Sequence, residues 1–150
     1  MGRIRVSTVI DAPPEAVWDE VRHLQRHVDW MADAEAIRFT SKQREGKGTT
    51  FDCDTRIGPF RLTDRMEVTE WRAGRSIGVR HVGLVTGTGR FTLRRAGRSG
   101  RDRNRTRFTW DERLRFPWWM GGPIGGVVGG RAMKLVWRRN LRTLKRQVER

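Results

Sequence analysis

The chain has 150 residues and one cysteine, Cys53, so it fits a single domain over residues 1–150 and cannot form an intramolecular disulfide, which favours a cytoplasmic protein. Its longest uncharged run, residues 116–130, falls short of the about 20 apolar residues that a membrane-spanning helix needs. The net charge of +15 comes from 28 arginines and only four lysines spread along the chain, a skew also typical of GC-rich coding, so we do not expect nucleic acid as the partner.

The N-terminal segment reads as a strand followed by helical turns. Ile4, Val6, Thr8 and Ile10 share one face of an alternating run, which predicts a strand. The sequence Asp11-Ala12-Pro13-Pro14 ends it, because proline lacks the ladder donor but suits a helix start. Apolar residues at helical spacing then predict two short helices, the first from about Pro13 to Arg22 and the second to about Met31.

The middle of the chain alternates apolar and polar residues in six sets separated by turn residues. These sets predict six antiparallel strands in meander order, at about residues 37–39, 51–57, 62–68, 77–81, 85–93 and 108–116. Between the last two sets, residues 94–107 hold seven arginines and are predicted to form a polar loop.

The C-terminal segment predicts one long helix that begins near Pro123. Its apolar stripe is expected to include Val128, Ala132, Leu135, Trp137, Leu141, Leu144 and Val148. An antiparallel sheet must cover one face, and only this helix is long enough to do so. We therefore predict an α+β helix-grip fold, in which a curved antiparallel sheet of six to seven strands wraps around the long C-terminal helix.

Two segments carry a resemblance to a known family. The run from Val9 to Trp18, with His27 and Trp30-Met31 after it, resembles the opening of the START-like superfamily, and the segment from Met66 to Trp71 resembles its middle strand and turn. The relevant branch is the polyketide cyclase/dehydrase and lipid-transport family with the birch-pollen-allergen fold. The resemblance extends over the whole chain and implies an internal cavity for a lipid, polyketide or other hydrophobic small molecule.

The predicted inward faces supply the candidate cavity lining. Large apolar side chains with few polar groups suit a small-molecule site, although they can also simply close-pack. The expected lining is Phe39, Phe51, Cys53, Met66, Phe91, Trp110, Leu114, Met133 and Trp137.

Three ionisable residues fall on faces that should be apolar. Glu112 alternates with Trp110 and Leu114, Asp64 lies between Leu62 and Met66, and His81 is also on an inward face. A buried carboxylate is costly unless it is paired or neutral. These residues are therefore candidate catalytic or ligand-orienting groups; the alternatives are a bulge, a structural ion pair and a hydrogen-bonded core histidine.

The glycine-rich segment before the long helix is a candidate cavity gate, formed by Trp118, Trp119, Met120, Gly121 and Gly122. Its tryptophans and flanking arginines also suit contact with an anionic membrane, and ordinary burial is the third option. His23 and His27 have a spacing that can bind zinc, but no third ligand is evident. We expect no metal and no cofactor, since the chain also lacks a phosphate-binding loop and a nucleophile elbow.

The function expected from these features is binding or transport of a hydrophobic small molecule by a monomer or homodimer. The first alternative is a polyketide cyclase/dehydratase that uses a cavity carboxylate as general acid and base. Enzymes of this family are expected to use cavity tyrosines, and this chain has no tyrosine. The second alternative is a basic surface module for anionic membrane or nucleic acid.

Overall fold

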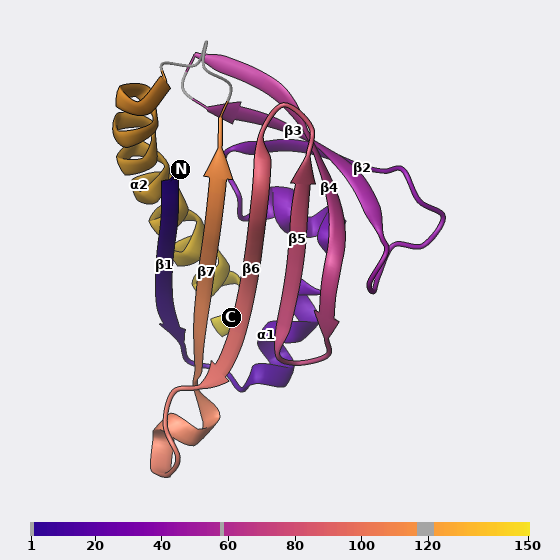
Figure 1. Ribbon diagram of the computed structural model, residues 1–150. Coiled ribbons are helices and arrows are strands. Elements are labelled where there is room, and N and C mark those ends of the chain that lie inside the picture. Colours follow the sequence, from indigo (N-terminus) through magenta and orange to yellow (C-terminus); the bar gives the residue numbers. More distant parts are fainter. Residues whose placement is uncertain (1, 58, 117–121) are drawn as a thin grey trace.

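The computed structural model describes residues 2–57, 59–116 and 122–150 (Figure 1). For Gly2, Ile57, Phe60 and residues 122–129 only the course of the backbone is described. The elements in chain order are β1 (Gly2–Ile10), α1 (Pro14–Val21), the 3-10 helix η1 (Leu24–Asp29), β2 (Ala34–Phe39), β3 (Thr50–Ile57), β4 (Phe60–Arg72), β5 (Ser76–Val82), β6 (Thr86–Arg95), the 3-10 helix η2 (Gly100–Asn104), β7 (Thr106–Arg115) and α2 (Gly122–Glu149).

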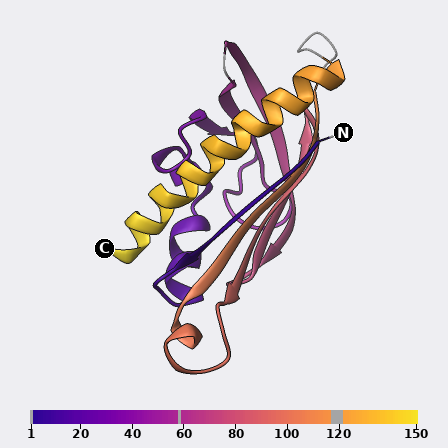
Figure 2. The same cartoon turned by 90° about the vertical axis from the view of Figure 1, so that its left-hand side faces the viewer.

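The seven strands form one antiparallel sheet in the order β1-β7-β6-β5-β4-β3-β2. Strands β2 to β7 follow one another as a meander. Strand β1 pairs with β7, so β1 and β2 are the two edge strands of the sheet. Figure 2 shows α2 crossing one face of the curved sheet diagonally. The predicted helix-grip fold is therefore confirmed.

Alternation of apolar and polar residues decides which face of each strand is buried. In β7 every second side chain is buried and the intervening ones face outward, because successive strand residues point to opposite faces. The buried set of β7 is Thr106, Phe108, Trp110, Glu112 and Leu114.

One predicted boundary is wrong, and one predicted helix is of the 3-10 type. Residues 94–107 are not one loop, because Arg94 and Arg95 pair with Arg107 and Thr106 and continue the β6–β7 ladder. Only the tip leaves the sheet, and part of it forms η2. The second short helix is a 3-10 helix that ends at Asp29, a tighter form that is common in short connectors.

The predicted apolar stripe of the long helix α2 is confirmed in part: Trp137, Leu141 and Leu144 are buried and Val148 packs against the core, whereas Ala132 and Leu135 are exposed. Leu135 is 62% exposed, because helical periodicity places it opposite Met133 and Trp137, which are buried. Asn140 is also buried and fixes α2 to the segment before β2: its side-chain amide donates to Asp33 at 2.8 Å and its oxygen accepts the N–H of Ala32 at 3.0 Å. In the described part of the chain, no helix has both the length and the apolar character needed to cross a membrane.

Candidate functional site

A pocket of about 90 Å³ lies between the sheet and α2. Eight of the nine predicted lining residues border it, namely Phe51, Cys53, Met66, Phe91, Trp110, Leu114, Met133 and Trp137. Phe39 is outside this lining, so its assignment to the cavity is wrong. It lies at the end of the edge strand β2, packs edge-on against Phe51 and is capped by Arg44.

Aromatic side chains fill much of the interior beside this pocket. The indoles of Trp110 and Trp137 stack with their centroids 4.1 Å apart and an interplanar angle of 9°. Phe91 and Trp30 pack against Trp110 at 5.3 and 6.0 Å. The pocket is therefore small beside the roughly 300–1,000 Å³ of sites that enclose drug-sized ligands.

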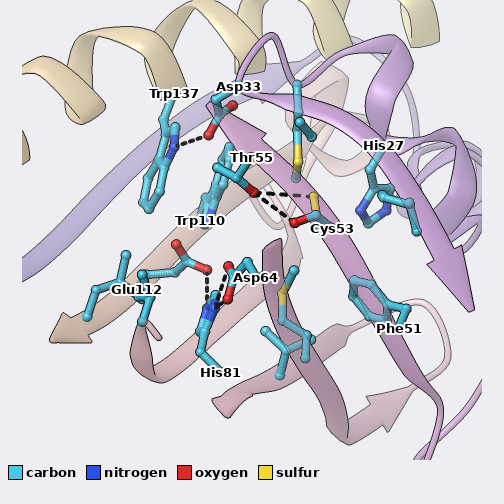
Figure 3. A pocket seen from close by; sticks show the side chains of 18 of the residues that line it. His27, Asp33, Phe51, Cys53, Thr55, Asp64, His81, Trp110, Glu112 and Trp137 are labelled. Carbon is cyan, nitrogen blue, oxygen red and sulfur yellow. Dashed lines mark hydrogen bonds and ion pairs between the residues drawn. The ribbon is translucent and has the colours of Figure 1, made fainter. Parts of the chain in front are cut away.

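The three ionisable residues predicted on inward faces meet in one cluster at this pocket (Figure 3). Nδ1 of His81, on β5, donates to Oδ2 of Asp64, on β4, at 2.8 Å. Nε2 of His81 donates to Oε1 of Glu112, on β7, at 3.0 Å. All three residues are buried. The imidazole therefore lies between two carboxylates in a place that is largely shielded from water.

Glycines in β6 allow His81 to reach Glu112, because β6 runs between their two strands. Gly87 is the cross-strand partner of His81 and Gly89 is that of Glu112. A Cβ at Gly89 would lie 2.8 Å from Cγ of Glu112. Gly87 has φ +130°, and a Cβ there would overlap with the carbonyl oxygen of Arg113. The missing side chains leave the space through which the contact forms.

The charges of the cluster depend on one another. Burial opposes protonation of His81, but the hydrogen bonds and negative charges of Asp64 and Glu112 outweigh it and raise the pKa of His81 to about 10. Burial raises the pKa of Glu112 above its usual value, and His81 only partly offsets this. At neutral pH the site therefore contains an imidazolium beside a carboxyl group that binds its proton more tightly than usual.

Three polar residues of the pocket were not predicted from the sequence, Asp33, Thr55 and Arg90, of which Arg90 is exposed and pairs with Glu70 at 3.0 Å. Asp33 lies in the turn before β2 and accepts a hydrogen bond from Nε1 of Trp137 at 3.2 Å. Thr55 donates to the carbonyl of Cys53 at 3.3 Å. Asp33 lies in a turn, so no alternation of apolar and polar residues around it predicts where its side chain points. Its partner Asn140 did carry a signal, because it interrupts the apolar face of α2.

The remaining candidates have simpler surroundings. His27 is buried, donates from Nε2 to the carbonyl of Val21 at 2.7 Å and packs against Trp30 and Phe91. Burial lowers the pKa of His27 to about 4 and raises that of the Cys53 thiol to about 12. Of the candidate gate, residues 118–121 lie outside the described residues, and Gly122 is the first residue of α2.

We predict that Gly89→Ala disrupts the cluster. The new methyl group would overlap with the Glu112 side chain, so the free energy of unfolding should fall by about 1–3 kcal/mol. Displacing Glu112 should also lower the pKa of His81, which an NMR titration of the imidazole measures. Gly130→Ala is the control: its Cβ would meet open space, so that variant should be unchanged or stabilised by about 0.5–1 kcal/mol. An unaltered His81 titration in Gly89→Ala would contradict the prediction.

We also predict that stability falls at alkaline pH. Unfolded histidine loses its proton at about pH 6.5, whereas folded His81 holds it to about pH 10. The stabilisation by protonated His81 is therefore complete below about pH 6.5 and is lost as the pH rises through about 10. The raised pKa of Glu112 acts in the same direction. Urea unfolding of the wild type should show a loss of about 2–4 kcal/mol between about pH 7 and pH 10.

His81→Gln tests this assignment. The variant should be less stable at pH 7, because two buried carboxylates lose their cation, and its pH profile should be flatter than that of the wild type. His23→Gln, outside the cluster, is the matched control and should keep the wild-type slope. Equal slopes in His81→Gln and the wild type would assign the pH dependence to other groups.

Comparisons with solved structures show the same fold in distant proteins. A protein from Thermus thermophilus is 17% identical, with a TM-score of 0.76, and the match covers 98% of this chain and 97% of that one. An aromatase/cyclase from a Streptomyces species is 17% identical, with a TM-score of 0.71 over 99% and 94% of the two chains. A START superfamily protein from Mycobacterium smegmatis is 12% identical, with a TM-score of 0.74 over 98% and 97%.

At these identities the solved structures establish the fold alone. No curated protein is similar enough to count as a match. The family described as polyketide cyclase/dehydrase and lipid transport matches residues 1–149, nearly the whole chain. The chain therefore belongs to the polyketide cyclase/dehydrase and lipid-transport family.

Proposed function

We propose that this protein binds and carries a hydrophobic small molecule, lipid-like or polyketide-like, in the pocket between the sheet and α2. The observation that carries the proposal is an apolar pocket with one buried acidic group available to a ligand. Oε1 of Glu112 is held by His81, whereas Oε2 has no hydrogen-bond partner among the described residues. Figure 3 shows this second oxygen turned away from His81. Family membership supports the same ligand class.

The small volume of the pocket has to be reconciled with such a ligand. Met31, Met66 and Met133 all border it, and methionine side chains adapt to different shapes at low cost. Rotation of these side chains would widen the pocket without moving the sheet. We expect apolar burial to supply most of the affinity and Glu112 to select ligands that offer a hydroxyl or another donor. Because the chain's one cysteine is a buried free thiol, we place this role in the cytoplasm.

A pair of small probes tests the role of Glu112. Titration calorimetry should show that p-cresol binds more tightly than toluene, because the phenol donates to Oε2 of Glu112. Glu112→Gln should reduce this preference by about tenfold, since a hydrogen bond to a charged group contributes about 1.5–3 kcal/mol. Glu67→Gln is the matched control: it is the same substitution at an outer-face glutamate that pairs with Arg80 at 2.6 Å. Native mass spectrometry of the protein from its own host should detect a bound apolar molecule. If no such molecule is found and neither probe binds, the binding function is wrong.

The cluster also favours a second candidate function, dehydration of a hydroxy ketone. Oε2 of Glu112 would take the proton from the carbon beside the ketone, and the electron pair of that C–H bond would form the enolate. When the enolate collapses to the new carbon–carbon double bond, the C–O bond breaks and Glu112 returns its proton to the leaving hydroxyl, which departs as water. The His81 imidazolium would stabilise the carboxylate form of Glu112 before it takes the proton and after it returns it.

The substrate 4-hydroxy-4-phenylbutan-2-one tests this candidate, because its dehydration product absorbs in the near ultraviolet. Glu112→Gln should lose at least about a hundredfold in turnover, the usual contribution of a general acid or base, while still binding toluene. Glu67→Gln should keep the wild-type rate. If the wild type shows no turnover, or Glu112→Gln keeps full activity, the catalytic role is wrong and the binding function is unaffected.

A further inference from the structure

The outward face of α2 carries six positive charges and no acidic residue among them. The exposed cations of this face are Arg131, Lys134, Arg138, Arg139, Arg142 and Arg146; we call this set the α2 basic face. At 1.5 Å per residue the set extends over about 22 Å. The one acidic residue of α2, Glu149, lies beyond the set and pairs with Lys145.

Within the part of the chain that the structure describes, none of these six residues forms an ion pair with a carboxylate. Some arginines on the strands are paired with carboxylates. Arg38 pairs with Asp54 and Arg80 with Glu67, both at 2.6 Å, and Arg3 pairs with Asp111 at 2.9 Å. Other exposed strand arginines, such as Arg5 and Arg113, form no ion pair among the described residues, so the α2 basic face is distinguished by having six cations on one face of a single helix with no acid among them.

This arrangement costs stability. Like charges four residues apart on a helix repel each other by about 0.2–0.5 kcal/mol per pair, and Lys134, Arg138, Arg142 and Arg146 form three such consecutive pairs. A negatively charged partner would remove this repulsion. Charge complementarity thus indicates an anionic surface at least as long as the α2 basic face.

One apolar residue distinguishes between anionic partners. Leu135 lies among these cations and is 62% exposed. Against a nucleic acid this side chain would face phosphates and water, whereas at a bilayer it can enter the boundary between headgroups and acyl chains. Interfacial helices combine basic residues with such apolar side chains. We propose that the α2 basic face and Leu135 dock this protein on an anionic lipid bilayer, with α2 parallel to the membrane plane.

The opposite face of α2 keeps the helix in place during docking. Asn140 and Trp137 are both hydrogen-bonded to Asp33, and Gln147 donates to the carbonyl of Asp29 at 3.0 Å. Docking therefore requires no unfolding of the helix from the sheet. The proposal does not depend on whether the pocket holds a ligand.

Vesicle co-flotation tests the proposal. The probe is phosphatidylcholine vesicles with and without phosphatidylglycerol, at low and high salt. The wild type should float only with the anionic vesicles, and added salt should weaken its binding because it screens the charges. Arg138→Gln/Arg142→Gln should reduce the partition coefficient by about 30-fold, which corresponds to about 1 kcal/mol for each removed charge. Leu135→Ser should reduce it by about tenfold.

Arg5→Gln/Arg113→Gln is the matched control. It removes the same charge from exposed positions on the outer face of the sheet and should change binding by less than about threefold, as expected of charges held farther from the bilayer. Equal losses in both double variants would overturn the proposal, because total charge alone would then explain binding. It would also be overturned if the wild type does not float, or if duplex DNA displaces it from vesicles while Leu135→Ser binds normally. Every substituted side chain is exposed, so thermal unfolding should be unchanged in Leu135→Ser and Arg5→Gln/Arg113→Gln, and unchanged or slightly more resistant in Arg138→Gln/Arg142→Gln, which removes three like-charge pairs.

Discussion

The buried imidazolium of His81 between Asp64 and Glu112 constrains much of the surrounding structure. Three ionisable groups inside an apolar pocket are tolerated only when their charges compensate and their hydrogen bonds are made. That requirement fixes three strands relative to one another, since Asp64, His81 and Glu112 come from β4, β5 and β7. It also fixes the composition of β6, where side chains at positions 87 and 89 would separate the partners.

Strand alternation predicted that each of these three residues faces inward, but not that they meet. Their contact depends on the register of four strands, and register across a meander is set by side-chain fit and turn geometry rather than by the local pattern. Gly87 and Gly89 were nevertheless a usable signal, because two glycines at inward positions of one strand leave space for long side chains from its neighbours. The same limit explains Phe39, which alternates correctly but lies at the end of an edge strand, beyond the pocket.

The extent of helix α2 was predicted more accurately than the side of the helix that faces the sheet. Its sequence contains more apolar residues than its buried face can hold, so Leu135 looked like part of the stripe. The polar contact of Asn140 with Asp33 and the stacking of Trp137 on Trp110 select the rotation that the helix adopts, and both depend on residues far away in the sequence. Asn140 shows that a buried polar residue can carry more directional information than an apolar one, because it must find a specific partner.

The two faces of α2 connect the interior of the protein with its basic surface. On the inner face Met133 and Trp137 border the pocket, and beside them on the outer face Lys134 and Arg138 are exposed. A rigid helix that forms a wall of the pocket and also contacts an anionic surface would set the orientation of the pocket relative to that surface. The hydrogen bonds of Trp137 and Asn140 to Asp33 would support this coupling, because they prevent α2 from rotating independently of the sheet. Neighbouring residues of α2 therefore meet opposite requirements, apolar fit on the inner side and positive charge on the outer side. This accounts for a helix in which Trp137, only 2% exposed, is followed directly by Arg138 and Arg139.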